Sequence, residues 1–256
     1  MTGDIALFLL VMARVSVFVA FFPLFTKRQL PSHVKAGLAA ALSFFWYADA
    51  KNVIDVPELD DIGGWVFTFL VFKEVFTGIL LSLLLGLFFW PSRIAGSYIA
   101  QELGLSLAAI SDPSSQDSST LVSRVFESFS ILVFFALNLH HFIILTLHFS
   151  FHYMLTQVGM MTLPTEAFVT AFGNSDDYGL LIIAPVLVML MMVTLVLAFL
   201  NRAAPSLNLF SIGMPLRVGF GVMLLFVFSP IIFGAMEMYF YRVQEDIESI
   251  LALLAG

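Results

Sequence analysis

The sequence predicts an all-α integral membrane protein with about six long hydrophobic helices and one further helix that is buried or re-entrant. Of the 256 residues, 60% are hydrophobic and only 11% are charged, and the mean hydropathy is +1.00. Soluble domains carry about 25% charged residues. The apolar residues also form long runs, and a helix needs about 20 such residues to cross a bilayer. We expect one helical membrane domain over residues 1–256.

About six apolar stretches are long enough to approach or span a bilayer. In chain order they are Ile5–Phe22, Val34–Tyr47, Trp65–Trp90, Leu121–Tyr153, Leu180–Leu200 and Leu216–Tyr241. The second is short, so its assignment as a span has less support. The first has no basic segment before it and continues too far for a cleaved signal sequence, so we interpret it as a retained helix.

A seventh segment, Ser92–Ala109, predicts a helix that is only half apolar. It carries the polar residues Gln101 and Glu102. Its small residues are Ala95, Gly96, Ala100 and Gly104. Small residues let helices approach closely, whereas polar side chains are costly against lipid. We therefore expect this helix to be buried in an assembly or re-entrant.

The connections between the apolar runs alternate in charge. Basic residues follow the first, third and fifth runs, at Lys27, Arg28, Lys35, Arg93, Arg124, Arg202 and Arg217. Acidic residues dominate the second connection, the loop expected after the fourth run and the C-terminus, at Asp49, Asp55, Glu58, Asp60, Asp61, Glu166, Asp176, Asp177, Glu245, Asp246 and Glu248. The positive-inside rule places the basic connections in the cytoplasm. The acidic connections and both termini would then lie outside.

The segment Asn201–Leu216 breaks the hydrophobicity between the last two runs. It contains a cation and two prolines within the sequence NRAAPSLNLFSIGMPL. Irregular polar backbone at membrane depth is tolerated only where protein or a water-filled path covers it. The break is therefore typical of a pore, a transporter or a multi-subunit membrane assembly.

The polar loop Ser111–Thr120 (SDPSSQDSST) is the most hydrophilic internal segment. Serine, aspartate and proline between two helices indicate a loop. Its flanks are apolar, at Leu105, Leu107, Ile110, Leu121 and Val122. Two interpretations stay open: a simple cytoplasmic connection, or a plug that seals a lumen and moves aside.

Arg14 lies inside the first apolar run, and Lys73 and Glu74 lie inside the third. Each costs about 2.5–3.5 kcal/mol at a helix centre unless it is paired. Neighbours on a helix point in different directions, so Lys73 and Glu74 should have different partners. An ion or proton relay would need more than one buried acid, so we favour structural ion pairs within or between subunits.

No catalytic or metal-binding signature is present in the sequence. It contains no phosphate-binding loop, dinucleotide-binding motif, zinc-protease motif or nucleophile elbow. Cysteine is absent. His141, His148 and His152 share helical spacing, but no carboxylate or thiolate completes a metal site on that face. We expect no enzyme, no cofactor and no metal, and histidines that hydrogen-bond between helices.

Several groups of residues, in order along nearly the whole chain, are similar to the motifs of one family. They are Arg14–Val15 with Pro23–Leu24–Phe25, Pro31, Val34, Lys35, Ala36 and Gly37; Lys73–Glu74 with Gly78 and Gly86; Gly96, Gln101, Gly104, Leu105, Ser106 and Asp112–Pro113–Ser114; Asn138 and His140; and Asn201–Arg202, Ala204–Pro205, Asn208, Phe210, Gly213 and Pro215. Leu139 replaces the glycine of an Asn-Gly-His element, and Ser206 stands where glutamine is more usual. On these motifs the chain resembles the flagellar FliR family and its type III secretion counterparts, the SctT (YscT/SpaR) proteins.

The resemblance implies a FliP-like part over about 1–178 fused to a FliQ-like helical hairpin over about 179–256. It implies a subunit of the type III protein export gate in the bacterial inner membrane, at the flagellar basal body. Expected partners are several FliP-like and FliQ-like subunits, FlhB-like and FlhA-like export proteins, the lipid bilayer and unfolded flagellar substrates, but no nucleic acid. A separate ATPase and the proton-motive force would supply energy, so this chain should not hydrolyse nucleotide.

The resemblance also assigns roles to particular residues. The segment around Ser106–Val122 would line or close the pore, with Leu107, Ile110, Ser111, Asp112, Pro113, Ser114 and Ser115 as plug residues. Arg14, Lys73 and Glu74 would form structural ion pairs. The C-terminal motif is Asn201, Arg202, Pro205, Asn208, Phe210, Gly213 and Pro215.

Two alternatives are weighed against the flagellar interpretation. An injectisome subunit would share these motifs, but the Asp-Pro-Ser-Ser stretch and the Asn-Arg-x-Ala-Pro end of the fifth run favour the flagellar branch. A stand-alone secondary transporter would contain inverted repeats and paired broken helices, whereas only one interruption is clear here.

Overall fold

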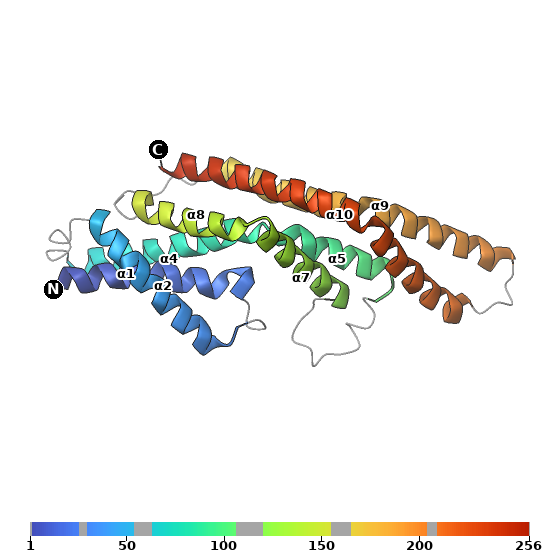
Figure 1. Ribbon diagram of the computed structural model, residues 1–256, viewed down its shortest axis with the longest axis horizontal. Helices are drawn as coiled ribbons and strands as arrows, with labels where there is room; N and C mark the ends of the chain where they lie inside the picture. Colours follow the sequence, from blue (N-terminus) through green and yellow to red (C-terminus); the bar gives the residue numbers. More distant parts are fainter. Residues whose placement is uncertain are drawn as a thin grey trace. The chain divides into compact units, whose positions relative to one another are not determined.

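The computed structural model describes residues 2–25, 30–53, 63–105, 120–154, 165–203 and 209–255. Every regular element in these ranges is helical (Figure 1). The elements are α1 (Thr2–Phe21), the short 3-10 helix η1 (Pro23–Phe25), α2 (Ser32–Val53), α4 (Gly64–Gly86), α5 (Trp90–Glu102), α7 (Leu121–Ala136), α8 (Leu139–Met154), α9 (Thr165–Ala203) and α10 (Leu209–Ala255). The predicted all-α class is confirmed.

Four helices in the described ranges are long and apolar enough to cross a membrane: α1, α4, α9 and α10. A fifth span results if α7 and α8 are counted as one broken crossing. The protein is therefore an integral membrane protein. The sequence suggested about six apolar spans, and the difference lies in α2, which is 22 residues long but is not among these candidates.

Helix boundaries differ from the predicted runs where the backbone turns. The run Leu121–Tyr153 is two helices, because Asn138 adopts a left-handed φ of 58° and ends the first. Asparagine is one of the few residues that tolerates this conformation. The segment Ser92–Ala109 was predicted as one helix, but α5 already ends at Glu102. The residues 106–109 lie outside the described ranges.

Two predicted irregular segments are largely helical. The acidic residues Glu166, Asp176 and Asp177 were expected in a loop, but all three belong to α9. The expected break at Asn201–Leu216 is shorter, because α9 continues through Ala203 and α10 starts at Leu209. Proline did not end these helices: Pro215 and Pro230 lie inside α10, and Pro185 lies inside α9.

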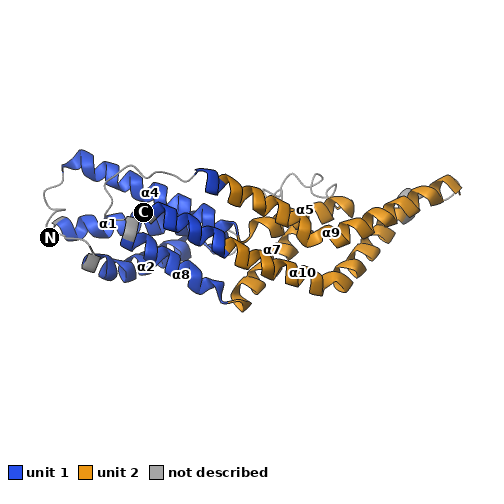
Figure 2. Ribbon diagram, turned by 90° about the horizontal axis from the view of Figure 1, so that it is seen from above, with its two compact units in different colours: residues 1–87, 138–168, 244–256 blue, residues 88–137, 169–243 orange. Residues whose placement is uncertain are grey.

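The chain divides into two compact units, coloured separately in Figure 2. Unit 1 comprises residues 1–87, 138–168 and 244–256, and unit 2 comprises residues 88–137 and 169–243. This division follows packing. The predicted division near residue 178 concerns similarity to separate subunits, and it stays a prediction.

Unit 1 is built on α1, which packs against α2 and α4, while α2 also contacts α8. Aromatic rings fill its interior. Phe18 stacks on Phe22 with ring centroids 4.9 Å apart, and Trp46 lies 5.7 Å from Phe151. Phe151 also contacts one of the intramembrane charges described below.

Unit 2 is built on the pair α5 and α7 together with α9 and α10. Phe88 and Phe134 meet edge to face at 5.4 Å, and Phe240 of α10 lies 5.7 Å from Phe88. Between α9 and α10, the hydroxyl groups of Ser175 and Tyr239 share a buried hydrogen bond of 2.9 Å.

Candidate functional site

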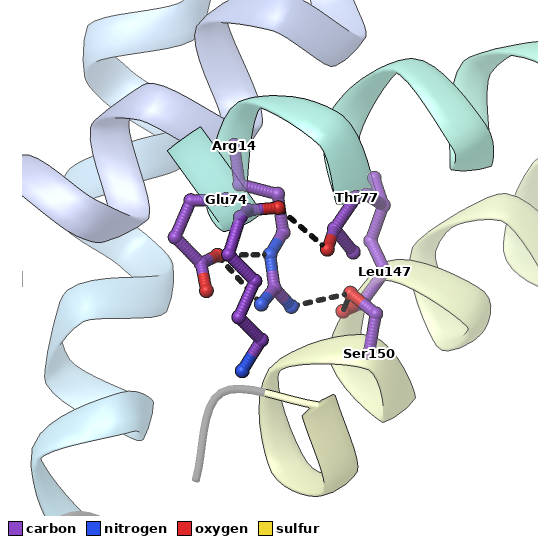
Figure 3. Close-up of polar contacts among 6 residues, drawn as sticks. Arg14, Glu74, Thr77, Leu147 and Ser150 are labelled. Carbon is purple, nitrogen blue, oxygen red and sulfur yellow. Dashed lines mark hydrogen bonds and ion pairs between the residues drawn. The ribbon is translucent and has the colours of Figure 1, made fainter. Parts of the chain in front are cut away.

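A buried ion pair joins α1 to α4 in unit 1. Arg14 Nε donates to Glu74 Oε2 at 2.6 Å, and both side chains are almost fully buried, at 0% and 2% exposure. Arg14 Nη2 also lies 2.6 Å from this oxygen, as an ion contact without hydrogen-bond geometry. Figure 3 shows the pair at the centre of the cluster.

Helix α8 completes the surroundings of the guanidinium. Arg14 Nη1 donates to Ser150 Oγ at 3.0 Å, and Ser150 Oγ donates to the carbonyl of Leu147 at 2.7 Å (Figure 3). The guanidinium carbon lies 4.5 Å from the ring centroid of Phe151, which supplies a cation–π contact. One arginine therefore links three helices.

Close helix packing brings the two charges together. A Cβ on Gly78 would lie 2.7 Å from the backbone oxygen of Arg14, so only glycine allows α4 to cross α1 this closely. Gly86, eight residues along α4, lies against Pro23 at 3.4 Å by the same measure. The sequence pattern of small residues on this helix thus corresponds to an interface.

Of the three charges predicted inside apolar runs, the structure pairs Glu74 with Arg14. Lys73, the neighbour of Glu74 in the sequence, is half-buried. The backbone carbonyl of Lys73 accepts a hydrogen bond from Thr77 Oγ1 at 2.9 Å. Ser150 and Phe151 are partners that the sequence did not identify. The only available signal was indirect: a buried arginine needs neutral acceptors as well as an acid, and α8 offers hydroxyl groups.

In unit 2, the polar loop has one well-defined stem at the end of α5. Gly104 adopts a φ of 75°, its N–H donates to the carbonyl of Gln101, and the N–H of Leu105 donates to Ala100. These paired bonds form a Schellman motif, which needs a left-handed residue such as glycine. Arg217 of α10 donates from Nη1 to the carbonyl of Glu102 at 3.3 Å, placing a cation at the helix C-terminus.

The second stem is the start of α7. Thr120 caps this helix by accepting from the N–H of Ser123 at 3.2 Å, and Ser97 of α5 shares a hydrogen bond of 3.0 Å with the Ser123 hydroxyl. A Cβ on Gly96 would lie 2.4 Å from Ser123 Cα, so α5 and α7 touch backbone to backbone. Both stems of the loop are therefore held on α5.

The predicted plug residues lie outside the described residues: Leu107, Ile110, Ser111, Asp112, Pro113, Ser114 and Ser115. Of the C-terminal motif, Asn201 and Arg202 are exposed on the last turn of α9, and Gly213 and Pro215 are in α10. Phe210 is in the first turn of α10, while Pro205 and Asn208 lie outside the described residues.

The histidines of α8 were expected to hydrogen-bond between helices. Within the described ranges, no group of three or more His, Cys, Asp or Glu residues could hold a metal ion. His148 Nδ1 lies 3.0 Å from Asp49 Oδ2, which links α8 to α2. At the same end of unit 1, the hydrogen bond from Lys51 to Asp4 raises the pKa of the lysine.

Long apolar helices, a buried three-helix ion cluster and a polar-faced short helix define a helical integral membrane protein. The family model "Bacterial export proteins, family 1" matches residues 5–243. The chain is 30% identical over 251 residues to the flagellar biosynthetic protein FliR of Bacillus subtilis (strain 168), covering 96% of this chain and 95% of that protein. It is 30% identical over 247 residues to FliR of Escherichia coli (strain K12), covering 94% and 92%.

A secretion relative is also similar. The surface presentation of antigens protein SpaR of Shigella sonnei is 29% identical over 189 residues, covering 72% of this chain and 70% of that protein. The chain belongs to the bacterial export proteins, family 1. Within that family its flagellar relatives make it a subunit of the flagellar type III export apparatus.

Proposed function

We propose that this chain forms part of the protein-conducting gate of the flagellar export apparatus, in the bacterial inner membrane at the basal body. It would assemble with FliP-like and FliQ-like subunits, cooperate with FlhB-like and FlhA-like proteins, and pass unfolded flagellar subunits. The similarity to the two FliR proteins over more than nine-tenths of each chain is the observation that carries this proposal.

The exposed surfaces of the isolated chain support a role as one subunit among several. The apolar windows of α9 and α10 are only 22% and 17% buried within the chain. Helix α5 has an exposed polar side at Arg93, Tyr98 and Gln101, which lipid would not stabilise. Both features fit a chain whose remaining surface is covered by other subunits or by an aqueous passage.

Within this gate, the loop 106–119 is our candidate for the element that closes the passage. It contains most of the polar loop Ser111–Thr120 and the apolar residues that precede it. The residues that border it are held on α5, through the Schellman motif at Gly104 and through the cap at Thr120, whose partner Ser123 bonds to Ser97. A segment with fixed stems can change conformation without disturbing the helices beside it.

The gating role is tested by deleting residues 111–119 while keeping the cap residue Thr120. A matched variant replaces the same residues by a glycine–serine stretch of equal length. If the loop seals the gate, the deletion raises ion leakage through assembled complexes. The glycine–serine variant then shows whether sealing needs this particular sequence or only a loop of this length. Unchanged leakage in a correctly assembled deletion variant would refute a sealing role.

Injectisome export is the weaker alternative. The secretion relative covers 72% of this chain, whereas the first flagellar relative covers 96%. Complementation separates the two. The chain should restore motility to a flagellated bacterium that lacks its own FliR, and failure there combined with restored secretion in a strain lacking SpaR would reverse the assignment.

A further inference from the structure

Helices α5 and α9 enclose an open groove on unit 2. Its volume is about 460 Å³, which is within the range of binding sites. The lining residues mix charged, polar and apolar side chains: Arg93, Ile94, Ser97, Tyr98, Gln101, Asp176, Asp177 and Leu180. None of the residues of the ion cluster around Arg14 is among these lining residues.

The α5 wall of the groove is one continuous helical stripe. The lining residues Arg93, Ser97, Tyr98 and Gln101 follow one another at three- or four-residue spacing, apart from the adjacent pair at 97 and 98. Trp90, which does not line the groove, extends this stripe by three residues towards the start of α5. Trp90 and Tyr98 are 45% and 42% exposed, and the Arg93 side chain is 47% exposed. Tryptophan, tyrosine and arginine are the residue types that contribute most to protein interfaces.

The groove carries unbalanced negative charge. Arg93 is already neutralised, because its Nη2 lies 2.7 Å from Glu127 Oε1. Among the described residues, Asp176 has a neutral hydrogen-bond partner: its carboxylate accepts from the indole Nε1–H of Trp90 at 2.8 Å. Asp177 is exposed and makes no ion pair with the described residues. A cationic group is therefore the complementary occupant.

The chain's own undescribed segments next to the helices of unit 2 do not offer such a group. Residues 106–119 (SLAAISDPSSQDSS) contain two aspartates and no lysine or arginine, and residues 204–208 (APSLN) are uncharged. These two segments are therefore not the occupant, and a partner chain is the source that we infer for the cationic group. An unfolded substrate is a poor match, because a fixed pair of carboxylates would retain basic sequences and hinder their passage.

We propose that this groove is the docking site for a helix of a neighbouring export-gate subunit that places a lysine or arginine against Asp176 and Asp177. The stripe from Trp90 to Gln101 is about 16 Å long at 1.5 Å per residue, which matches three turns of a partner helix. This inference rests on the proposed function, since it requires partner chains, and it adds a specific contact to it.

The test uses the complete export complex from native membranes. A photo-crosslinking phenylalanine replaces Tyr98, and the same probe at Leu132, which is 68% exposed on α7 but outside the groove, is the control. The adduct is mapped by mass spectrometry. We expect a Tyr98 adduct to a membrane subunit, within one or two helical turns of a lysine or arginine, and a different adduct pattern from Leu132.

Charge reversal tests the electrostatic part. Asp177→Lys should reduce the Tyr98 adduct about tenfold or more, because like charges across an interface repel. Replacing the mapped cation by glutamate should restore it in the same complex. Asp177→Asn keeps the side-chain size and should reduce the adduct less than the lysine variant does.

Three results would overturn the inference while leaving the proposed function intact. The first is an intact complex with no adduct at position 98, and the second is an adduct to a segment without lysine or arginine. The third is an adduct only to export substrate or to a second copy of this chain. Insensitivity of the adduct to Asp177→Lys would do the same. Failure to recover any complex with the unmodified chain would instead refute the proposed function, and the inference with it.

Discussion

The buried ion pair between Arg14 and Glu74 leads to the sharpest prediction about stability. Replacing Glu74 by glutamine leaves a guanidinium that is 0% exposed with Ser150 as its neutral partner and Phe151 beneath it. Removing one partner of a buried pair costs about 3–5 kcal/mol, because the remaining charge has no compensation. At 1.4 kcal/mol per factor of ten, the unfolding equilibrium constant should rise about 100-fold or more.

A double replacement shows whether the cost comes from leaving one buried charge unpaired or from changing these two positions. Arg14→Leu combined with Glu74→Leu removes both charges and should be far less destabilising than either single change, since apolar residues often substitute for buried pairs at little cost. Glu127→Gln is the matched control, because its partner Arg93 is 47% exposed and such surface pairs contribute about 0–1 kcal/mol.

The assay is detergent-induced unfolding of the purified protein in mixed micelles, followed by circular dichroism. The reasoning is refuted if Glu74→Gln and Arg14→Leu each cost less than about 1 kcal/mol, the value of an exposed pair. It is also refuted if the double variant loses as much as the sum of the singles, because the two residues would then act independently.

Three further substitutions test the helix contacts in the same unfolding assay. Gly96→Ala should destabilise the protein by about 1–3 kcal/mol, because the new Cβ would meet Ser123 Cα at 2.4 Å. Gly173→Ala, in open space on α9, is the control and should be neutral or stabilising. Equal effects of the two changes would refute the close contact. Asn138→Ala should cost about 1–2 kcal/mol at its φ of 58°, and Asn138→Gly should not, so a harmless alanine would contradict the left-handed backbone. Thr120→Ala should cost about 1 kcal/mol by removing the cap of α7, and Thr120→Ser should retain it.

The sequence was sufficient to predict the fold class and the approximate positions of the long helices. Apolar runs are set by the solvent, and a bilayer imposes the same length requirement on every span. The charges inside the runs also predicted buried ion pairs, because an unpaired charge at that depth is costly. The separate partners predicted for Lys73 and Glu74 stay a prediction for Lys73, whereas Glu74 pairs with Arg14.

Helix ends and partners were less predictable, because they depend on local backbone conformation and on distant segments. The turn at Asn138 interrupts an apolar run that hydropathy treats as continuous. Pro215 marks no helix end, since neighbouring helices can compensate for the lost backbone bond. Ser150 lies 136 residues from Arg14, and no local pattern connects the two.

Composition and residue spacing did not predict the groove between α5 and α9. Asp176 and Asp177 read as part of an acidic loop in the sequence, because acidic residues followed an apolar run. In the structure they belong to α9 and line one wall opposite the α5 stripe. Their meaning depends on which helix lies across from them, which a single sequence does not specify.

The central claim is that this chain is one subunit of a multi-protein export gate. The most direct test is to purify the tagged chain from native membranes in mild detergent and identify the proteins that accompany it by mass spectrometry. The account predicts one particle that contains FliP-like and FliQ-like subunits. A stable, monodisperse monomer or homodimer without these partners would contradict it.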